Sequence, residues 1–259
     1  MTQADLAPQT LAASTALAAR FYSDPNLAAV EREHIFARSW QLIAGVSQLA
    51  DAGDHVVAEI ADTPILVVRG ADGALRGFIN VCKHRAGPIA TCDGRGAKAL
   101  RCRYHGWTYG LDGVLKAATE MQDARDFDVG AIRLTPITVD TWRGLVFAAL
   151  DPAMPLSELL AGTEKHLGAR DFSHYQFEKK VPYPVSCNWK VYADNYLEGY
   201  HVPHVHPELN KLLDYRSYVT ETDRWHSLQY SPMEGAGNFY GDGVALYFYL
   251  WPNLMLNIL

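Results

Sequence analysis

The sequence predicts an α+β protein in which a small antiparallel β domain precedes an α+β domain, where a helix packs on an antiparallel sheet. Three observations favour this fold class. Residues 40–152 contain short β-rich segments separated by glycine-containing turns. Two prolines in residues 151–155 break any regular element and mark a boundary. Beyond it, a helical segment is followed by residues 247–259, an apolar run typical of strands.

We therefore expect three parts: an N-terminal helical segment over residues 1–39, the β domain over 40–152, and the first portion of the second domain over 153–259. The apolar run stops at Leu259. A strand of this kind without neighbours on both sides is an aggregation hazard. We therefore expect a truncated chain whose second domain is incomplete.

Composition limits the class of protein. The 259 residues are 49% hydrophobic, enough for about two packed domains, and carry a formal net charge of −6, which disfavours nucleic acid as the main partner. No basic and apolar leader and no run of about 18 apolar residues occurs, so we expect neither export nor membrane anchoring. Four cysteines fit a reducing cytoplasm better than a disulfide scaffold.

Helices are expected before the β domain, over residues 10–22 and 26–41. Asp24 and Pro25 suit the N-cap and first position of the second helix. In the β domain we expect strands at residues 55–60, 64–68, 75–81, 134–139 and 145–150, with turns at 70–73 and 110–113.

The second domain is expected to open with a strand over residues 177–185. A helix then begins near Asn188 and carries Asp194, Asn195 and Glu198. Several carboxyl or amide groups thus lie just before a histidine-rich stretch.

Two short motifs of the β domain each combine one cysteine with one histidine. Cys82 and His84 form the first, Cys102 and His105 the second, and the 17 residues 85–101 separate them. Two thiolates and two imidazoles on two loops can hold a [2Fe–2S] cluster, with the cysteines on one iron and the histidines on the other. Such a Rieske centre passes single electrons, at roughly −150 to +300 mV against about −400 mV for a plant-type ferredoxin.

A structural zinc site is the alternative interpretation of these four residues. Zinc ligands usually come as a cysteine pair and a histidine pair, whereas each loop here supplies one of each, so we favour the cluster. The other cysteines are interpreted as ordinary thiols, Cys92 in a surface loop and Cys187 buried. Four basic residues flank the loops, and we favour a solvated rim over a docking surface for an acidic electron donor: Lys83, Arg85, Arg101 and Arg103.

Three histidines in six residues, His201, His204 and His206, indicate a second metal site suited to iron(II) or another first-row ion. A surface cluster of histidines is the alternative. Helix geometry does not decide which two bind, because the first two lie on one helix face while His201 and His206 lie about 140° apart on an ideal helix. Pro203 disfavours helix at Val202, so we expect the chain to leave the helix here.

The stretch from His105 to Tyr109 is similar to oxygenase-type Rieske domains, and the disulfide cysteines of respiratory Rieske proteins are missing. The later residues resemble the mononuclear-iron motif of the Rieske non-haem iron ring-hydroxylating oxygenase large (alpha) subunits: Asn188, Trp189, Lys190, Asp194, Asn195, Glu198, Gly199, Tyr200, His201 and His206. The resemblance implies that His201 and His206 bind the iron, that His204 is a neighbour, and that Asn195 and Glu198 belong to the catalytic residues.

In this family the acidic residue three positions before the first histidine bridges to a cluster histidine of the adjacent subunit. The resemblance therefore gives Glu198 the role of an electron and proton bridge and implies a homotrimer. A surface glutamate near Lys190 is the plain alternative. The family also needs a carboxylate as third iron ligand, which we expect beyond Leu259. The later carboxylates present are the weaker candidates: Glu208, Asp214, Glu221, Asp223, Glu234 and Asp242.

The resemblance implies an enzyme, a mono- or dioxygenase. A flavin/iron-sulfur reductase would draw electrons from NAD(P)H, the Rieske cluster would relay them singly, and mononuclear Fe(II) would activate O₂ beside a small organic substrate. A Rieske electron carrier needs little more than residues 40–152, so the residues beyond favour an oxygenase. A non-catalytic fragment that holds the cluster alone is a further alternative.

With Glu rather than Asp at position 198, the motif is most similar to the branch of choline and carnitine monooxygenases, which oxidise quaternary ammonium compounds. We therefore favour hydroxylation or N-demethylation of a quaternary amine over hydroxylation of an aromatic acid. Later aromatic residues could cage a methylated ammonium, at roughly 0.5–2 kcal/mol per cation–π contact, or stack on an aromatic acid, or simply be core. They are Trp225, Tyr230, Phe239, Tyr240, Tyr247, Phe248, Tyr249 and Trp251.

Overall fold

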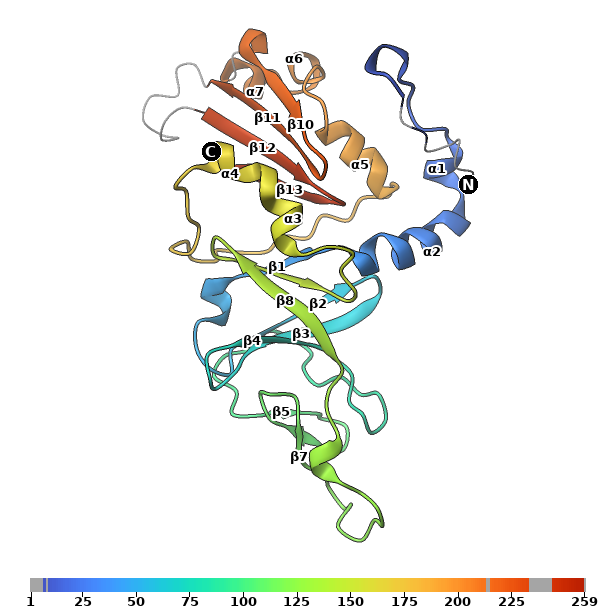
Figure 1. Cartoon of the computed structure of the whole chain (residues 1–259), viewed down its shortest axis with the longest axis vertical. Helices are drawn as coiled ribbons and strands as arrows, with labels where there is room; N and C mark the ends of the chain where they lie inside the picture. The colour runs from blue at the N-terminus through green and yellow to red at the C-terminus, as the bar shows by residue number, and fades with distance from the viewer. Residues whose placement is uncertain (1–6, 8, 213–214, 233–243, 259) are drawn as a thin grey trace.

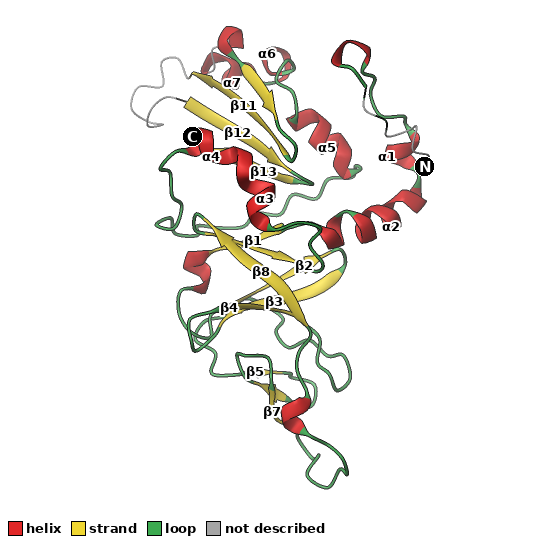
Figure 2. Cartoon of the chain, in the orientation of Figure 1, coloured by secondary structure: helices red, strands yellow, loops and turns green. Residues whose placement is uncertain are grey.

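The computed structural model describes residues 7, 9–212, 215–232 and 244–258 of the chain. It is an elongated molecule with a six-stranded sheet in the middle, a four-stranded sheet at one end and a three-stranded sheet at the other (Figure 1). All strand pairs in the described sheets are antiparallel. Most of the α-helices lie at the end of the molecule that holds the four-stranded sheet, and short 3₁₀ turns lie beside the other two sheets (Figure 2). The α+β class expected from the sequence is confirmed.

The six-stranded sheet has the order β1-β9-β8-β4-β3-β2. Its strands are β1 (Gln41–Gly45), β2 (His55–Ile60), β3 (Thr63–Arg69), β4 (Leu75–Ile79), β8 (Pro136–Trp142) and β9 (Leu145–Ala149). These bounds confirm the expected strands to within a few residues. The turn at residues 70–73 is closed by a hydrogen bond from the Gly73 N–H to the Gly70 carbonyl, 3.0 Å long.

The three-stranded sheet forms the tip of the molecule. It consists of β5 (Leu100–Arg101), β6 (Thr108–Tyr109) and β7 (Leu115–Ala117). The first cysteine–histidine loop follows β4, and the second connects β5 to β6. Buried residues from both sheets meet beneath the loops: Leu66, Val68, Phe78, Cys82, Ile89, Leu100, Cys102, Trp107, Tyr109, Leu115 and Leu134.

The four-stranded sheet has the order β10-β11-β12-β13, with β10 (Val219–Thr222), β11 (His226–Pro232), β12 (Val244–Leu250) and β13 (Leu254–Ile258). The helices of this part are α3 (Leu156–Leu160), α4 (Glu164–Leu167), α5 (Trp189–Tyr196), α6 (Val202–Val205) and α7 (Pro207–Leu212). Single 3₁₀ turns lie at Leu11–Ala13, Phe36–Arg38, Val46–Leu49, Val129–Ala131, Ala161–Thr163 and Tyr215–Ser217. In the described part of the chain, no helix has the length and apolar character that crossing a membrane requires.

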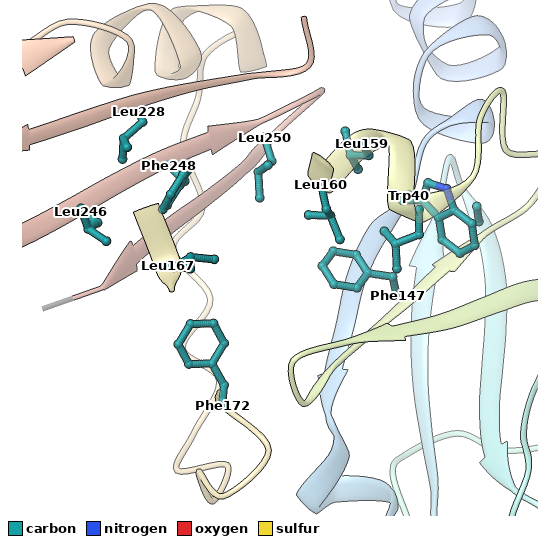
Figure 3. Packing of buried hydrophobic residues seen from close by; sticks show 12 residues of the cluster. Trp40, Phe147, Leu159, Leu160, Leu167, Phe172, Leu228, Leu246, Phe248 and Leu250 are labelled. Carbon is teal, nitrogen blue, oxygen red and sulfur yellow. The ribbon is translucent and has the colours of Figure 1, made fainter. Parts of the chain in front are cut away.

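One hydrophobic core joins the six-stranded and four-stranded sheets (Figure 3). Phe147 of β9 and Phe248 of β12 are 1% and 0% exposed, and Leu159 and Leu160 of α3 belong to the same cluster. The indole N–H of Trp40 donates to the Met154 carbonyl at 2.9 Å across the proline-rich boundary. The expected boundary near residue 152 is thus a packed junction, because apolar burial continues across it.

The N-terminal helices differ from expectation. Residues 10–22 form no continuous helix, since only Leu11–Ala13 and α1 (Arg20–Ser23) are helical. Among the residues of this segment whose burial is described, only Phe21 is buried, and a short helix without packing is marginal in water. The second helix, α2 (Pro25–His34), ends seven residues earlier than expected, while its cap is confirmed: the Asp24 carboxylate accepts from the Asn26 N–H at 2.9 Å.

Other expectations for the second domain were wrong. Residues 177–185 are extended and exposed and pair with no described strand; Pro182 and Pro184 lack the N–H groups that pairing needs. The C-terminal run is a hairpin of β12 and β13 instead of one strand. Cys187 is exposed, although it was expected to be buried. Cys92, in the β domain, is exposed as expected.

Candidate functional site

The two cysteine–histidine loops share one backbone design. In each, the cysteine N–H donates to the carbonyl five residues later, and the cysteine carbonyl accepts from the N–H four residues later. These bonds are 2.8 to 3.0 Å long and join Cys82 to Gly87 and Ala86, and Cys102 to Trp107 and Gly106. The residue four positions on has a left-handed backbone in both loops, with φ of 55° at Ala86 and 75° at Gly106. Both loops therefore fold back tightly toward their cysteine.

The structure brings the four predicted cluster residues together. Cys82 and Cys102 are 3% and 2% exposed, and the rings of His84 and His105 lie with centroids 4.6 Å apart at 72°. Nδ1 of His84 is buried and has no hydrogen-bond partner. Burial, then the neighbouring His105 and Arg85, lower the pKa of His84, which favours the neutral imidazole that binds metals. An unpartnered buried nitrogen is costly, so this donor set fits a metal centre.

The arrangement also bears on the zinc alternative. Among the residues that the structure describes, no three or more His, Cys, Asp or Glu side chains are placed to hold one ion. A tetrahedral zinc site needs four ligands around one point, whereas each iron of a Rieske cluster takes only two protein ligands. The pairing of one cysteine with one histidine in each loop remains the reason why we favour the cluster.

Two aromatic side chains support the loops. The Trp107 indole stacks on the His84 ring, with centroids 4.9 Å apart and planes 8° apart. The Tyr109 hydroxyl lies 3.3 Å from Sγ of Cys82 and accepts the Lys83 N–H at 3.1 Å. Burial, followed by the contact with Cys82, raises the pKa of Tyr109, so its hydroxyl stays protonated. Sequence reasoning noted this stretch as typical of the family but gave neither residue a role.

The second predicted site lies where α5 ends and α6 begins. Asn188 caps α5 with its side chain, which accepts from the Lys190 N–H at 3.1 Å. The helix ends at Tyr196, before Glu198, and Pro203 lies in the first turn of α6, where its missing N–H costs little. The expectation that one helix carries Glu198 and breaks at Pro203 was therefore wrong.

Two of the three histidines face the same space. His201 precedes α6, His206 follows it, and their ring centroids are 5.2 Å apart. The Glu198 carboxylate contacts Nδ1 of His201 and accepts the His201 main-chain N–H at 3.2 Å. His204 is exposed and does not line this space. An imidazole held at Nδ1 by a carboxylate presents Nε2 outward, which is the usual orientation for a metal ligand.

A cavity of about 160 Å³ adjoins His201 and His206. Three tyrosines and three amides are among its lining residues, namely Tyr196, Tyr218, Tyr247, Asn195, Gln229 and Asn257. The Tyr218 hydroxyl donates to Oε1 of Gln229 at 2.8 Å, and the Tyr196 hydroxyl donates to Oδ1 of Asn257. Burial, then neighbouring tyrosines, raises the pKa of Tyr196.

Of the predicted aromatic residues that the structure describes, only Tyr247 lines this cavity. Phe248 is core and Tyr249 is buried, while Phe239 and Tyr240 lie outside the described residues. Tyr196 and Tyr218 were missed, because the prediction considered the later strands and ignored the flanks of the histidine motif.

The later carboxylates do not complete the site in the described ranges. Glu208 pairs with Lys211 at 2.7 Å, Glu221 pairs with Lys165 at 2.7 Å, and Asp223 lies beside His226 near the end of α3. Asp214, Glu234 and Asp242 lie outside the described residues. The described residues thus provide two imidazoles and the Glu198 carboxylate that holds one of them.

N-terminal residues brace α5 in a way that the sequence did not suggest. The Glu31 carboxylate accepts a hydrogen bond from the Trp189 indole N–H at 2.8 Å. It also forms an ion pair with Lys190, and both of these charged side chains are nearly buried. The Tyr22 hydroxyl donates to Asp194 at 2.6 Å, which raises the pKa of Tyr22 to about 12. Lys190 is therefore occupied by Glu31 and is not a partner of Glu198.

The two sites lie at opposite ends of the molecule. The sheet of β5 and β7, beside the cluster loops, forms the lower tip in Figure 1, whereas α5 and α6 lie at the upper end. The whole six-stranded sheet separates them.

Comparison with known proteins gives two family matches. The Rieske [2Fe-2S] domain matches residues 39–133, and the catalytic domain of the ring hydroxylating alpha subunit matches residues 172–259. The chain is 35% identical over 253 residues to the carnitine monooxygenase oxygenase subunit of Escherichia coli (strain K12), covering 93% of this chain and 66% of that protein. It is 33% identical over 258 residues to a chloroplastic choline monooxygenase of Arabidopsis thaliana, covering 92% and 60%. The chain thus spans two thirds or less of these relatives.

Solved structures give the same result. A quaternary ammonium Rieske monooxygenase, described for carnitine oxidation and inter-subunit electron transfer, superposes with a TM-score of 0.84 at 30% identity, covering 92% of this chain and 67% of that one. The same type of enzyme in complex with its substrate L-carnitine gives a TM-score of 0.81 at 29% identity, covering 92% and 65%. Naphthalene 1,2-dioxygenase, at 22% identity and a TM-score of 0.78 over 91% and 64%, shares the fold.

Proposed function

The chain belongs to the Rieske-type ring-hydroxylating oxygenases as an alpha subunit, and we propose that it is the terminal oxygenase component acting on a quaternary ammonium compound. The observation that carries this proposal is the occurrence in one chain of two separate donor sets. One set has two cysteines and two histidines, and the other has two histidines held beside a polar, tyrosine-lined cavity. An electron carrier needs only the first set.

We assign the cluster to Cys82, His84, Cys102 and His105. The buried cysteines and the unpartnered Nδ1 of His84 support this assignment. When bound, a Rieske cluster accepts and donates single electrons. The protein contributes by excluding water around the thiolates, by stacking Trp107 on His84, and by placing the Tyr109 hydroxyl against Sγ of Cys82.

We assign the mononuclear iron to His201 and His206, with Glu198 holding His201. When bound there, iron(II) supplies the O₂ chemistry of this family. The Glu198 carboxylate accepts a hydrogen bond from the Nδ1–H group of His201, which fixes the orientation of the ring. The same carboxylate can take up or return a proton at that nitrogen. Asn195, in the lining of the same cavity, supplies a neutral amide next to this pair.

The separation of the two sites supports transfer between copies of the chain. A cluster at the tip of one copy could approach the Glu198 region of the next in a head-to-tail ring, and a homotrimer is the closed ring that the family leads us to propose. A flavin/iron-sulfur reductase drawing on NAD(P)H is the proposed electron donor. The exposed basic rim of Lys83, Arg85, Arg101 and Arg103 remains a predicted solvated surface.

The tyrosine-lined cavity supports a quaternary ammonium substrate. Tyr196, Tyr218 and Tyr247 bring three aromatic rings to the histidine pair, and the described lining contains no lysine or arginine. A methylated ammonium gains cation–π attraction from such rings and needs no hydrogen-bond acceptor. The relatives that act on carnitine and choline support the same choice over an aromatic acid.

The proposed domains are residues 1–39, 40–152 and 153–259, and the proposed location is the cytoplasm. The sheets fall on either side of the second boundary, with β9 ending at Ala149 and α3 beginning at Leu156. All four cysteines are free, two of them exposed, which suits a reducing compartment.

A substrate comparison tests the proposed function. The purified chain is loaded with iron and sulfide, reduced with dithionite and exposed to O₂ with L-carnitine, choline or benzoate. We expect oxidised product from a quaternary amine and none from benzoate, measured by mass spectrometry. Iron analysis should give three irons per chain for an oxygenase and two for a carrier. Oxidation of benzoate alone would contradict the proposed substrate, and two irons with no product would favour an electron carrier or a non-catalytic fragment over an oxygenase.

Replacing Tyr109 by phenylalanine should lower the reduction potential of the cluster. A hydrogen bond from the hydroxyl to a ligand sulfur stabilises the more negative, reduced cluster, and phenylalanine removes that bond while keeping the ring in its buried place. Potentiometric titration should show a decrease of some tens of millivolts. Tyr104→Phe is the matched control, because Tyr104 is 63% exposed and its hydroxyl makes no hydrogen bond to a cysteine sulfur among the described residues. The potential of this variant should equal that of the unmodified protein.

A further inference from the structure

The two cluster loops differ in how the chain that leaves them is held. The second loop lies inside a hairpin, because β5 leads into it and β6 leads out, with Leu100 paired to Tyr109 and Arg101 paired to Thr108. The first loop is entered from β4, but no strand follows it before β5 begins at Leu100. The exit of the first loop therefore lacks the ladder of hydrogen bonds that holds the second.

The side chain of Asn80 occupies the place of this missing ladder. Asn80 lies directly after β4, and its N–H donates to the Pro64 carbonyl of β3 at 2.8 Å. Its Oδ1 accepts from the N–H groups of Ile89 and Ala90, both at 3.0 Å, and its Nδ2 donates to the Ala90 carbonyl at 2.7 Å. One side chain thus makes three hydrogen bonds to the loop exit, as a neighbouring strand would.

The burial of this contact makes it rigid. Asn80 is 6% exposed and Ile89 is 5% exposed, the latter within the core beneath the cluster loops. A buried amide that loses its partners leaves unsatisfied polar groups on both sides, so the bonded arrangement is strongly preferred. The exit of the first loop is therefore fixed to the six-stranded sheet.

The position of the loop exit affects both cluster loops through Gly87. Gly87, two residues before Ile89, packs so closely that a Cβ placed on it would lie 3.2 Å from Sγ of Cys102. Its carbonyl accepts the Cys82 N–H at 2.8 Å. A shift of residues 88–90 would move Gly87 and change the spacing of the two cysteines.

From these contacts we propose that Asn80 is a positioning residue of the cluster site, setting the first loop, with Cys82 and His84, against the second. Asn80 does not touch the cluster ligands through its side chain and acts through Ile89 and Ala90. This inference rests on the proposed function, because it concerns the cluster assigned to these loops.

Three variants test it. Asn80→Ala removes all three side-chain hydrogen bonds, and Asn80→Asp keeps the acceptor for Ile89 and Ala90 while losing the donor. Asp54→Ala is the matched control, because Asp54 is also buried, at 2% exposed, and its carboxylate accepts the Gly96 N–H of the same connection at 2.9 Å. The control removes comparable bonds at a point further from the loop.

The measurements are the half-life of the cluster absorbance in a chelator, the EPR spectrum of the dithionite-reduced protein, and the thermal unfolding temperature. We expect Asn80→Ala to lose its cluster about tenfold faster than the unmodified protein, the change that about 1.4 kcal/mol produces, with shifted EPR g values. Asn80→Asp should be intermediate. Asp54→Ala should lower the unfolding temperature yet keep the original cluster half-life and spectrum.

The outcomes separate this inference from the function. If Asn80→Ala keeps the original half-life and spectrum, or Asp54→Ala loses its cluster equally fast, Asn80 has no special role, although the protein remains a Rieske protein. If Asn80→Ala does not fold, the test uses Asn80→Asp. Faster cluster loss with shifted g values would then support the role of Asn80, and an unchanged half-life and spectrum would contradict it. An unmodified chain that takes up no cluster contradicts the proposed function and this inference together.

Discussion

Replacement of Cys102 with alanine should remove the [2Fe–2S] cluster completely. The thiolate is one of only two sulfur ligands, and alanine leaves one iron with a single protein ligand in a site that is 2% exposed. Water cannot replace a thiolate there without opening the packed loops. Cluster iron and sulfide should fall from about two of each per chain to none, together with the visible absorbance and the EPR signal of the reduced protein.

The chain provides two matched controls for this substitution. Cys92 and Cys187 are also free cysteines, but both are exposed, so Cys92→Ala and Cys187→Ala should leave iron, sulfide and spectrum unchanged. Cluster loss in either control would show that the metal is held elsewhere. Full retention of the cluster by Cys102→Ala would contradict the assignment of the loops, and with it the proposed electron path.

The cluster site could be predicted from the sequence because its signals are local. Each loop brings its own cysteine and histidine within four residues, and glycine at position 106 allows the left-handed backbone at which the second loop turns. The strands around the loops were also predictable, since turn residues separate them. The contacts that hold the loops in place could not be predicted in this way. The Asn80 amide and the Tyr109 hydroxyl bond to partners 9 to 27 residues away, so no local sequence pattern indicates these contacts.

The second site was harder to predict in detail. The motif pointed to His201 and His206, and these two face one cavity while His204 does not. Helix periodicity alone left the choice open. Where α5 ends depends on tertiary contacts: Gln229 of β11 donates to the Tyr196 carbonyl at the end of the helix. The strand expected at residues 177–185 does not form, because Pro182 and Pro184 lack the N–H groups that pairing needs.

Replacement of Glu198 with glutamine should slow oxidation by about 10- to 100-fold while both metal contents stay the same. Glutamine keeps the size of the side chain and a carbonyl that can accept from His201, but it removes the negative charge. A carboxylate beside Nδ1 makes the imidazole a more basic ligand and can take up its proton, and a neutral amide does neither. The measurement is the rate at which the reduced cluster is reoxidised by O₂ with L-carnitine present.

Glu208→Gln is the matched control for this change. Glu208 lies on α7 close in sequence to His206, but its exposed carboxylate pairs with Lys211, and exposed pairs of this kind contribute little. The control should reoxidise at the rate of the unmodified protein. Equal rates for Glu198→Gln and the control would exclude a role for the charge at position 198. Loss of one iron per chain in Glu198→Gln would instead show that the carboxylate is needed to hold the metal, and the proposed bridge between copies would then be wrong.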